Sequence, residues 1–291
     1  MTTIPRQWAG KPGTGTSTQD PAAAEAVFLD ATLSLLEPLA IAPGDVVVDV
    51  GPGAGSATVA LARAVGDRGR VYAVDLDPAM LDATLEAARA AGVIDRIRPV
   101  LHDVEDGTPA LPEPADVVWA SWCVHHAHDW DAAVGALAGL LRPGGVLCVA
   151  EGGLPTRCLP WDVGTGRPGL EGRLDVAHDR YFSEWFFDRA AVRPGRGWSE
   201  ILTGAGLVDV TTHSTLVDYP APLSEQVRAV ALAELAARVR RAQPHLADDD
   251  AAAWARLLDP HDDAWLGHRG DLALLSARTA YRGRSAQPGR S

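Results

Sequence analysis

The sequence is poor in basic residues. Lys11 is its only lysine, and lysine and arginine together number 26 against 38 aspartates and glutamates, which gives a net charge of −12. The arginines are scattered along the chain instead of clustered, and a chain of net negative charge repels a phosphate backbone. We therefore expect no nucleic acid as the main substrate.

Cysteines and long apolar runs are also scarce. Cys123, Cys148 and Cys158 form no regular framework, which excludes a disulfide scaffold and favours reduced thiols. No apolar stretch approaches the roughly 20 residues that span a bilayer, and the first 15 residues lack the apolar run of a signal peptide. We therefore expect a cytoplasmic protein with no membrane partner.

From Asp45 onward, short β-branched runs alternate with helical stretches rich in alanine and leucine. This alternation is typical of βαβ units around a parallel sheet. The predicted strands are 46–50, 70–74, 97–101, 116–121 and 145–150. The predicted helices between them are 56–65, 78–91 and 129–141, and an earlier helix begins at Asp20 and Pro21.

The alternation of predicted strands and helices stops after Glu151. Residues 152–197 are rich in glycine, proline and aromatics, and we interpret them as a lid or a substrate-facing insertion. The later elements predicted are helices 198–205, 223–242 and 248–258 and strands within 207–217 and 274–283. We expect a flexible segment over 1–19 and one domain over 20–291. In that domain, 45–151 binds a cofactor, and 152–197 with 220–268 forms the substrate side.

One motif carries most of the chemistry. The strand Val46–Val50 runs into Gly51-Pro52-Gly53-Ala54-Gly55 and then into a helix, so the backbone can approach a nucleotide-like ligand closely. The next strand ends in Asp75, whose carboxylate can accept hydrogen bonds from ribose hydroxyls. A dinucleotide would also suit this pattern, but its fingerprint needs a third glycine at position 56, where this chain has Ser56.

The run from Asp49 to Gly55 resembles the acidic-x-Gly-x-Gly-x-Gly signature of class I S-adenosylmethionine-dependent methyltransferases. Four further elements of that family match in order over residues 45–151: Asp75, Asp103, Asp116 and the turn Leu141-Arg142-Pro143-Gly144-Gly145. The resemblance implies an α/β fold with a doubly wound, mostly parallel seven-stranded sheet, an inserted lid region and extra C-terminal helices. It implies S-adenosyl-L-methionine as the cofactor and S-adenosyl-L-homocysteine as its product. The cofactor contacts that it implies are Asp49, Gly51, Gly53, Gly55, Asp75, Leu76, Asp103, Val104 and Ser121.

Candidate catalytic residues follow the fourth strand, because ligands of a doubly wound sheet bind at the carboxyl ends of its strands. His125 or His126 can act as a general base, since an imidazole titrates near neutrality. The alternative is that these histidines only cap the loop or hydrogen-bond to the backbone. We expect no metal, because adjacent histidines on an extended segment point apart.

Aromatic residues are the candidates for binding an acceptor. The predicted substrate-binding residues are Trp122, Trp161, His178, Tyr181 and Trp185. The dense aromatic run over 181–187 can wall a pocket for a flat or apolar molecule, or it can be the face by which the lid packs.

The function that these features indicate is methyl transfer to an oxygen, nitrogen or carbon atom of a small, apolar or aromatic metabolite, in secondary metabolism or quinone-like chemistry. Two alternatives remain open. The first is a protein that binds the same cofactor in another role, and the second, disfavoured by the lack of a Tyr-x-x-x-Lys pair, is a nicotinamide-dependent oxidoreductase. The late helices leave a homodimer open.

Overall fold

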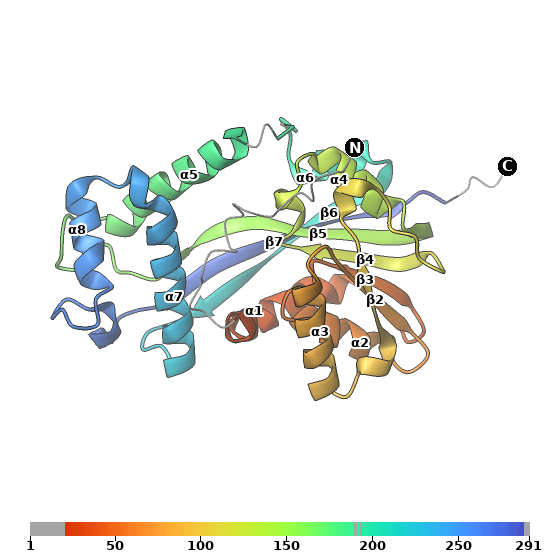
Figure 1. The fold of residues 1–291 in the computed structure, drawn as a ribbon, viewed down its shortest axis with the longest axis horizontal. Helices are drawn as coiled ribbons and strands as arrows, with labels where there is room; N and C mark the ends of the chain where they lie inside the picture. The colour runs from red at the N-terminus through yellow and green to blue at the C-terminus, as the bar shows by residue number, and fades with distance from the viewer. Residues whose placement is uncertain (1–20, 189–190, 193, 288–291) are drawn as a thin grey trace, which may run out of the picture. The chain divides into compact units, whose positions relative to one another are not determined.

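The computed structural model describes residues 21–188, 191–192 and 194–287. The chain divides into two compact units (Figure 1). Of the described residues, we call 25–156, 186–188, 191–192, 194–217 and 276–287 the sheet unit, and 21–24, 157–185 and 218–275 the helical unit. The predicted flexible segment 1–19, with Lys11, and the predicted helix cap Asp20 lie outside the described residues.

The central element is a seven-stranded sheet in the order β3-β2-β1-β4-β5-β7-β6. Its strands are β1 (Val46–Val50), β2 (Arg70–Asp75), β3 (Ile97–Leu101), β4 (Ala115–Ser121), β5 (Leu141–Arg157), β6 (Leu207–Tyr219) and β7 (Leu274–Ser285). β1 pairs in parallel with both β2 and β4, and β2–β3 and β4–β5 are parallel pairs as well. The strand order reverses between β1 and β4, so the predicted doubly wound, mostly parallel α/β fold is confirmed.

The helices are α1 (Pro21–Leu36), α2 (Ser56–Val65), α3 (Pro78–Ala90), α4 (Trp130–Ala138), α5 (Leu170–Asp188), α6 (Trp198–Gly204), α7 (Glu225–Ala242) and α8 (Asp248–Leu257). Local signals explain where several of them begin. Asp77 caps α3 by accepting a hydrogen bond from the amide of Ala79 (2.9 Å), and Pro78 occupies the first helical position, where no amide is needed.

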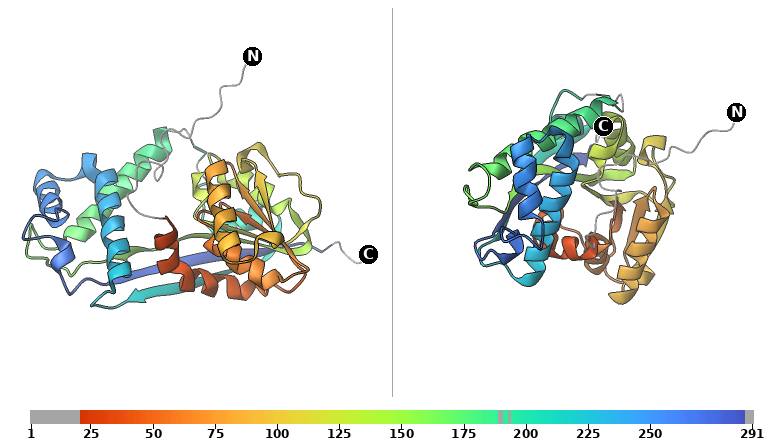
Figure 2. Two further views of the ribbon diagram at one scale, coloured as in Figure 1. Left: turned by 60° about the horizontal axis from the view of Figure 1, so that its bottom comes forward. Right: turned by 60° about the vertical axis from the view of Figure 1, so that its left-hand side comes forward.

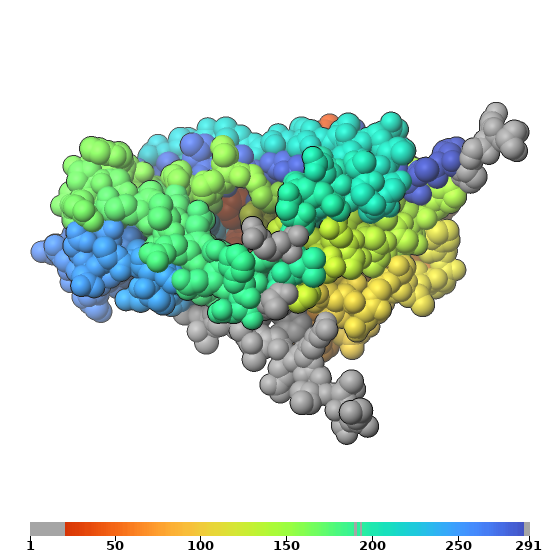
Figure 3. Space-filling model, turned by 90° about the horizontal axis from the view of Figure 1, so that it is seen from above, coloured from red at the N-terminus to blue at the C-terminus, as the bar shows by residue number. Residues whose placement is uncertain are grey.

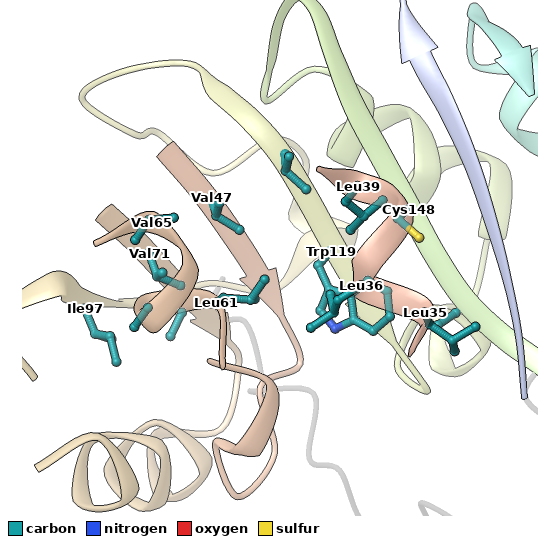
Figure 4. Packing of buried hydrophobic residues seen from close by; sticks show 14 of the residues in the cluster. Leu35, Leu36, Leu39, Val47, Leu61, Val65, Val71, Ile97, Trp119 and Cys148 are labelled. Carbon is teal, nitrogen blue, oxygen red and sulfur yellow. The ribbon is translucent and has the colours of Figure 1, made fainter. Parts of the chain in front are cut away.

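The central strands β1, β2, β4 and β5 are covered on both faces, and alternate residues of each strand point to opposite faces. Val47, Trp119 and Cys148 belong to a cluster that α1, α2 and α3 complete (Figure 4). Their neighbours along the strands belong to a second cluster, which α4 and α6 complete. Figure 1 shows α2 and α3 on one side of the strands and α4 and α6 on the other. Burial on both faces explains why β1 reads as an apolar run broken only by Asp49.

The helical unit gathers α5, α7 and α8 (Figure 2). Arg238 of α7 is buried between two acids of α5: it hydrogen-bonds to Glu171 (3.3 Å) and forms an ion pair with Asp175. Arg173 of α5 holds Asp250 of α8 by two hydrogen bonds of 2.7 and 2.8 Å. Figure 3 accordingly shows the green surface of α5 directly beside the blue surface of α8. Because each buried arginine or aspartate has a partner of opposite charge, the three helices can pack together with charged side chains between them.

Three elements differ from the prediction. β5 extends over Leu141–Arg157 instead of 145–150, and the expected turn at Pro143 lies within it, where the pairing with β4 shifts register. α4 consequently ends at Ala138, before the predicted position. The third element is α5, a helix of 19 residues inside the predicted lid. Its buried Leu170, Leu174 and Ala177 follow helical spacing, but the aromatic and polar residues between them obscure that period.

Within the described residues, no helix is both long and apolar enough to span a bilayer.

Leu61→Ala is expected to lower the free energy of unfolding by about 2–4 kcal/mol, because Leu61 of α2 is completely buried against the sheet and its truncation leaves a cavity. Leu33→Ala is the matched control, since Leu33 also lies on a helix but is 41% exposed, and it should cost under about 1 kcal/mol. Urea denaturation followed by circular dichroism measures both values. Equal losses would contradict the packing described for α2.

Candidate active site

The glycine loop connects β1 to α2. Gly51, Gly53 and Gly55 have φ angles of 67°, 60° and 93°. A Cβ on Gly51 would lie 2.6 Å from the Cβ of Cys123, and a Cβ on Gly55 would lie 2.9 Å from the backbone of Thr84. Both the backbone conformation and these close approaches therefore require glycine. The loop packs tightly between α3 and the segment that follows β4.

Glu25 of α1 binds this loop. Its Oε1 accepts a hydrogen bond from the amide of Ala54 (2.7 Å), and its Oε2 accepts one from the amide of Ser56 (3.0 Å). These amides lie at the start of α2, where N–H groups lack partners within the helix and the helix dipole favours a negative charge. Sequence reasoning missed Glu25, because the residues that it contacts lie 29 and 31 positions further along the chain and no motif includes it.

Asp49 lies beneath the loop and is only 1% exposed. Thr58 of α2 donates a hydrogen bond of 2.5 Å to its Oδ2. Burial raises the pKa of Asp49 to about 7; the hydrogen bond from Thr58 opposes this rise, and the charges of Glu25 and Asp75 add to it. The carboxyl of Asp49 therefore links β1 to α2 through Thr58. A positive charge nearby would lower its pKa.

Asp75 ends β2, and Asp103 follows β3. Each carboxylate stabilises the turn after it: Asp75 Oδ1 accepts from the amide of Asp77 (2.8 Å), and Asp103 Oδ1 accepts from the amide of Glu105 (2.9 Å). The amide of His102 donates to the carbonyl of Asp75 (2.9 Å), which ties the two turns together. The two acids are thus held at neighbouring strand ends.

The predicted cofactor-binding residues all lie at one edge of the sheet. In the parallel register Val50 pairs with Val74, and Asp75 pairs with Leu101, so β1, β2 and β3 end together. The remaining predicted contacts follow or end these strands and their neighbour β4: Leu76, Val104 and Ser121. The structure therefore brings these residues to the place where a doubly wound sheet binds its ligands.

His125 lies in a short turn after β4, Val124–His126. Its Nδ1 is 2.7 Å from Oε2 of Glu151, a residue of β5 that is 2% exposed. The ring of His126 lies beside that of His125, with the centroids 4.0 Å apart. Sequence reasoning found both histidines but missed Glu151, which it used only as the last residue of the regular pattern.

Trp122 separates Ser121 from this turn and adopts a left-handed conformation, with φ at 53°. Its amide donates to the carbonyl of Ala150 (3.0 Å), and its indole is 46% exposed. The Arg278 guanidinium lies 5.4 Å from the Trp122 ring and 4.1 Å from the ring of Phe28, while His125 meets the indole edge at 6.0 Å. The indole is therefore held in place yet presents a large apolar area to solvent.

Cys123 follows Trp122 and contacts the glycine loop. Burial raises the pKa of its thiol, and the charge of Glu151 adds to that effect. The thiol donates to the carbonyl of Val50 (3.2 Å). It therefore stays protonated and holds the loop in place, which does not suit a nucleophile.

The other predicted substrate-binding residues belong to the helical unit: Trp161, His178, Tyr181 and Trp185. Phe182 meets three of them through edge-to-face ring contacts, with centroid distances of 4.7, 5.5 and 6.3 Å. Trp161 stands apart from these rings on a loop and is 76% exposed. Their role in binding an acceptor stays a prediction.

His178 has a second contact, to α7. Arg241 donates a hydrogen bond to its Nε2 (3.3 Å). Burial, together with the charges of Arg241 and Arg238, lowers the pKa of His178 to about 4. The ring is therefore neutral at neutral pH, and its Nε2 lone pair is engaged between the helices.

Among the described residues, no group of three or more histidine, cysteine, aspartate or glutamate side chains is arranged to hold a metal ion. The site is instead a glycine loop with carboxylates at three neighbouring strand ends. The three glycines of the loop and the acidic groups suit a cofactor that carries ribose hydroxyls and positive charge.

The amino-acid sequence was compared with known proteins. Residues 47–145 match the methyltransferase domain family. A ubiquinone/menaquinone biosynthesis C-methyltransferase, UbiE, from Vibrio campbellii is 34% identical over 112 residues, which are 38% of this chain and 42% of that protein. UbiE from Shewanella frigidimarina is 32% identical over 123 residues, which are 41% of this chain and 47% of that protein. The chain thus spans less than half the length of these curated relatives.

Solved structures with the same fold cover more of the chain. A protein of Bacillus halodurans that is assigned to the methyltransferases aligns with 89% of this chain and all of its own, with a TM-score of 0.55 and 15% identity. Phosphoethanolamine N-methyltransferase 2 of Haemonchus contortus, in complex with S-adenosyl-L-methionine, aligns with 94% of this chain and 58% of its own, with a TM-score of 0.53 and 19% identity. The chain therefore has the fold of class I methyltransferases of known structure. Within this fold, residues 47–145 are similar to the methyltransferase domain family.

Asp49→Asn is expected to change the way in which stability depends on pH. The pKa of Asp49 is about 7 in the folded protein against an ordinary value of 3.8, so the folded state holds the proton more tightly. The stabilisation that this proton provides is complete at a pH below 3.8, the ordinary pKa. It is lost as the pH rises through about 7, the pKa in the folded protein. The free energy of unfolding of the wild type should therefore fall by roughly 1–3 kcal/mol relative to the variant between about pH 5 and about pH 8.

Urea denaturation of both cofactor-free proteins across this range measures the effect. The asparagine side chain of the variant can still accept the hydrogen bond from Thr58, so that contact is kept. A wild-type-to-variant difference that stays constant with pH would contradict the raised pKa.

Proposed function

We propose that this chain transfers the methyl group of S-adenosyl-L-methionine to an oxygen, nitrogen or carbon atom of a small, apolar or aromatic metabolite. The observation that carries the proposal is the arrangement of Asp49, Asp75 and Asp103 around the glycine loop at adjacent strand ends. A carboxylate at the end of the second strand suits the ribose hydroxyls, and the acidic surroundings suit a positively charged cofactor. The methyltransferase match over residues 47–145 covers these three residues.

The reaction makes few demands on side chains. When bound, the cofactor supplies an electrophilic methyl group on a positively charged sulfur. The residues of the chain must hold the acceptor in line with that group and remove a proton where the acceptor atom carries one. His125 is our candidate for the proton acceptor, because its side chain is 27% exposed and its ring is fixed by Glu151. His126 remains a second candidate beside it.

The surface around His125 supports a flat acceptor. The half-exposed Trp122 offers an apolar ring next to His125, and the guanidinium of Arg278 lies over the rings of both Trp122 and Phe28. An aromatic acceptor can stack on such a face with a gain of about 1 kcal/mol beyond its buried area. The curated relatives act in ubiquinone and menaquinone biosynthesis by name, which suits acceptors of this kind. Secondary metabolism is another setting in which such acceptors occur.

Asp75→Ala is expected to weaken binding of S-adenosyl-L-methionine and S-adenosyl-L-homocysteine by roughly 100-fold, since hydrogen bonds to a charged group contribute about 1.5–3 kcal/mol. Isothermal titration calorimetry measures the change. Asp82→Ala is the matched control: Asp82 lies on the exposed side of α3, so this variant removes the same charge nearby and should leave the affinity unchanged.

NAD(H) is titrated in parallel, and no binding is expected. Binding of NAD(H) alone would overturn the cofactor assignment. Tight binding of S-adenosyl-L-methionine without transfer of its labelled methyl group to any of a panel of phenols, quinols, amines and enols would instead favour a protein that uses this cofactor in another role.

A further inference from the structure

Glu151 is a buried carboxylate that contacts both the ring of His125 and the backbone of the turn that carries it. It is 2% exposed, and burial of a carboxylate is costly unless hydrogen bonds compensate for the lost water. Its Oε1 accepts from three consecutive backbone amides: Cys123 (3.0 Å), Val124 (2.9 Å) and His125 (3.3 Å). These bonds fix the carboxylate relative to the turn that carries His125.

The second oxygen of Glu151 faces the imidazole of His125. The distance from Oε2 to Nδ1 is 2.7 Å, which is a short hydrogen bond. An ionised carboxylate can only accept, so the ring must donate from Nδ1. In the neutral ring the proton is then on Nδ1, and the lone pair is on Nε2. The same carboxylate therefore controls both the position of the turn and the tautomer of the ring.

We propose that Glu151 is a positioning residue that holds His125 in the Nδ1–H tautomer, so that Nε2 is the atom that accepts the proton of the methyl acceptor. The inference rests on the proposed function for its catalytic meaning, whereas the tautomer itself follows from the contacts alone. When the acceptor atom forms its bond to the methyl carbon, the carbon–sulfur bond breaks and its electron pair stays on sulfur. The proton of the acceptor atom moves to Nε2, and the resulting imidazolium is stabilised by the negative charge of Glu151.

Glu151→Gln separates the two tasks of this side chain. The carbonyl oxygen of glutamine can still accept from the three amides, so the turn can keep its position. The amide nitrogen then replaces Oε2 and donates to Nδ1 of His125. This reverses the direction of that hydrogen bond and places the ring proton on Nε2, where it blocks proton uptake.

Nitrogen-15 correlation spectra of histidine-labelled protein at about pH 8.5 give a direct readout, since the two ring nitrogens have different shifts in the two tautomers. His125→Asn assigns the signals of His125 by their disappearance. We expect the Nδ1–H tautomer in the wild type and the Nε2–H tautomer in Glu151→Gln. Glu105→Gln is the matched control, because Glu105 also accepts from a backbone amide of this segment, that of His128, and it should leave the tautomer of His125 unchanged.

A wild-type His125 in the Nε2–H form would overturn the inference, even if Glu151→Gln failed to fold. With an acceptor that is methylated through a hydroxyl, kcat of Glu151→Gln should fall by about 10²-fold or more, while the affinity for S-adenosyl-L-methionine stays within about twofold. A kcat equal to that of the wild type despite a reversed tautomer would refute the catalytic role of Glu151. A protein that shows the Nδ1–H tautomer but methylates nothing would instead refute the proposed function and leave the tautomer assignment standing.

Discussion

The close approach of the glycine loop to the segment after β4 is the constraint on which the site depends. At Gly51 a single added carbon atom would collide with Cys123, and the thiol of that residue also bonds back to Val50 at the end of β1. The loop and the turn that carries His125 are therefore assembled as one unit. Any change that widens this contact would move the backbone predicted to bind the cofactor away from the candidate proton acceptor.

Negative charge is the second organising feature of the site. Glu25 occupies the amides at the start of α2, Asp49 lies buried below them, and Asp75 is close enough to raise the pKa of Asp49. Mutual repulsion between these carboxylates raises the pKa of Asp49, and a positive charge nearby would oppose that effect. The net charge of −12 and the acidic groups of the site thus act in the same direction, since both favour a positively charged ligand.

The sequence predicts the parallel half of the fold well, because each βα unit is short and its caps and apolar runs are local signals. It also predicts which acids follow the strands, since parallel strands end at one edge. It does not reveal α5, whose buried positions are masked by aromatic and polar neighbours. Nor does it reveal Glu25 or Glu151. Each accepts hydrogen bonds from backbone amides 26 to 31 residues away, and any residue type can supply such an amide, so no sequence motif marks the contact.

Trp122 combines a left-handed backbone with a half-exposed indole. A bulky residue costs about 1–2 kcal/mol in this conformation, which glycine would adopt without strain, and the exposed part of the ring gains little from burial. Laboratory evolution that selects only for heat resistance would therefore drift toward glycine or asparagine at this position. A library selected for stability should therefore hold position 122 constant wherever the predicted role of Trp122 in binding an acceptor is to be kept.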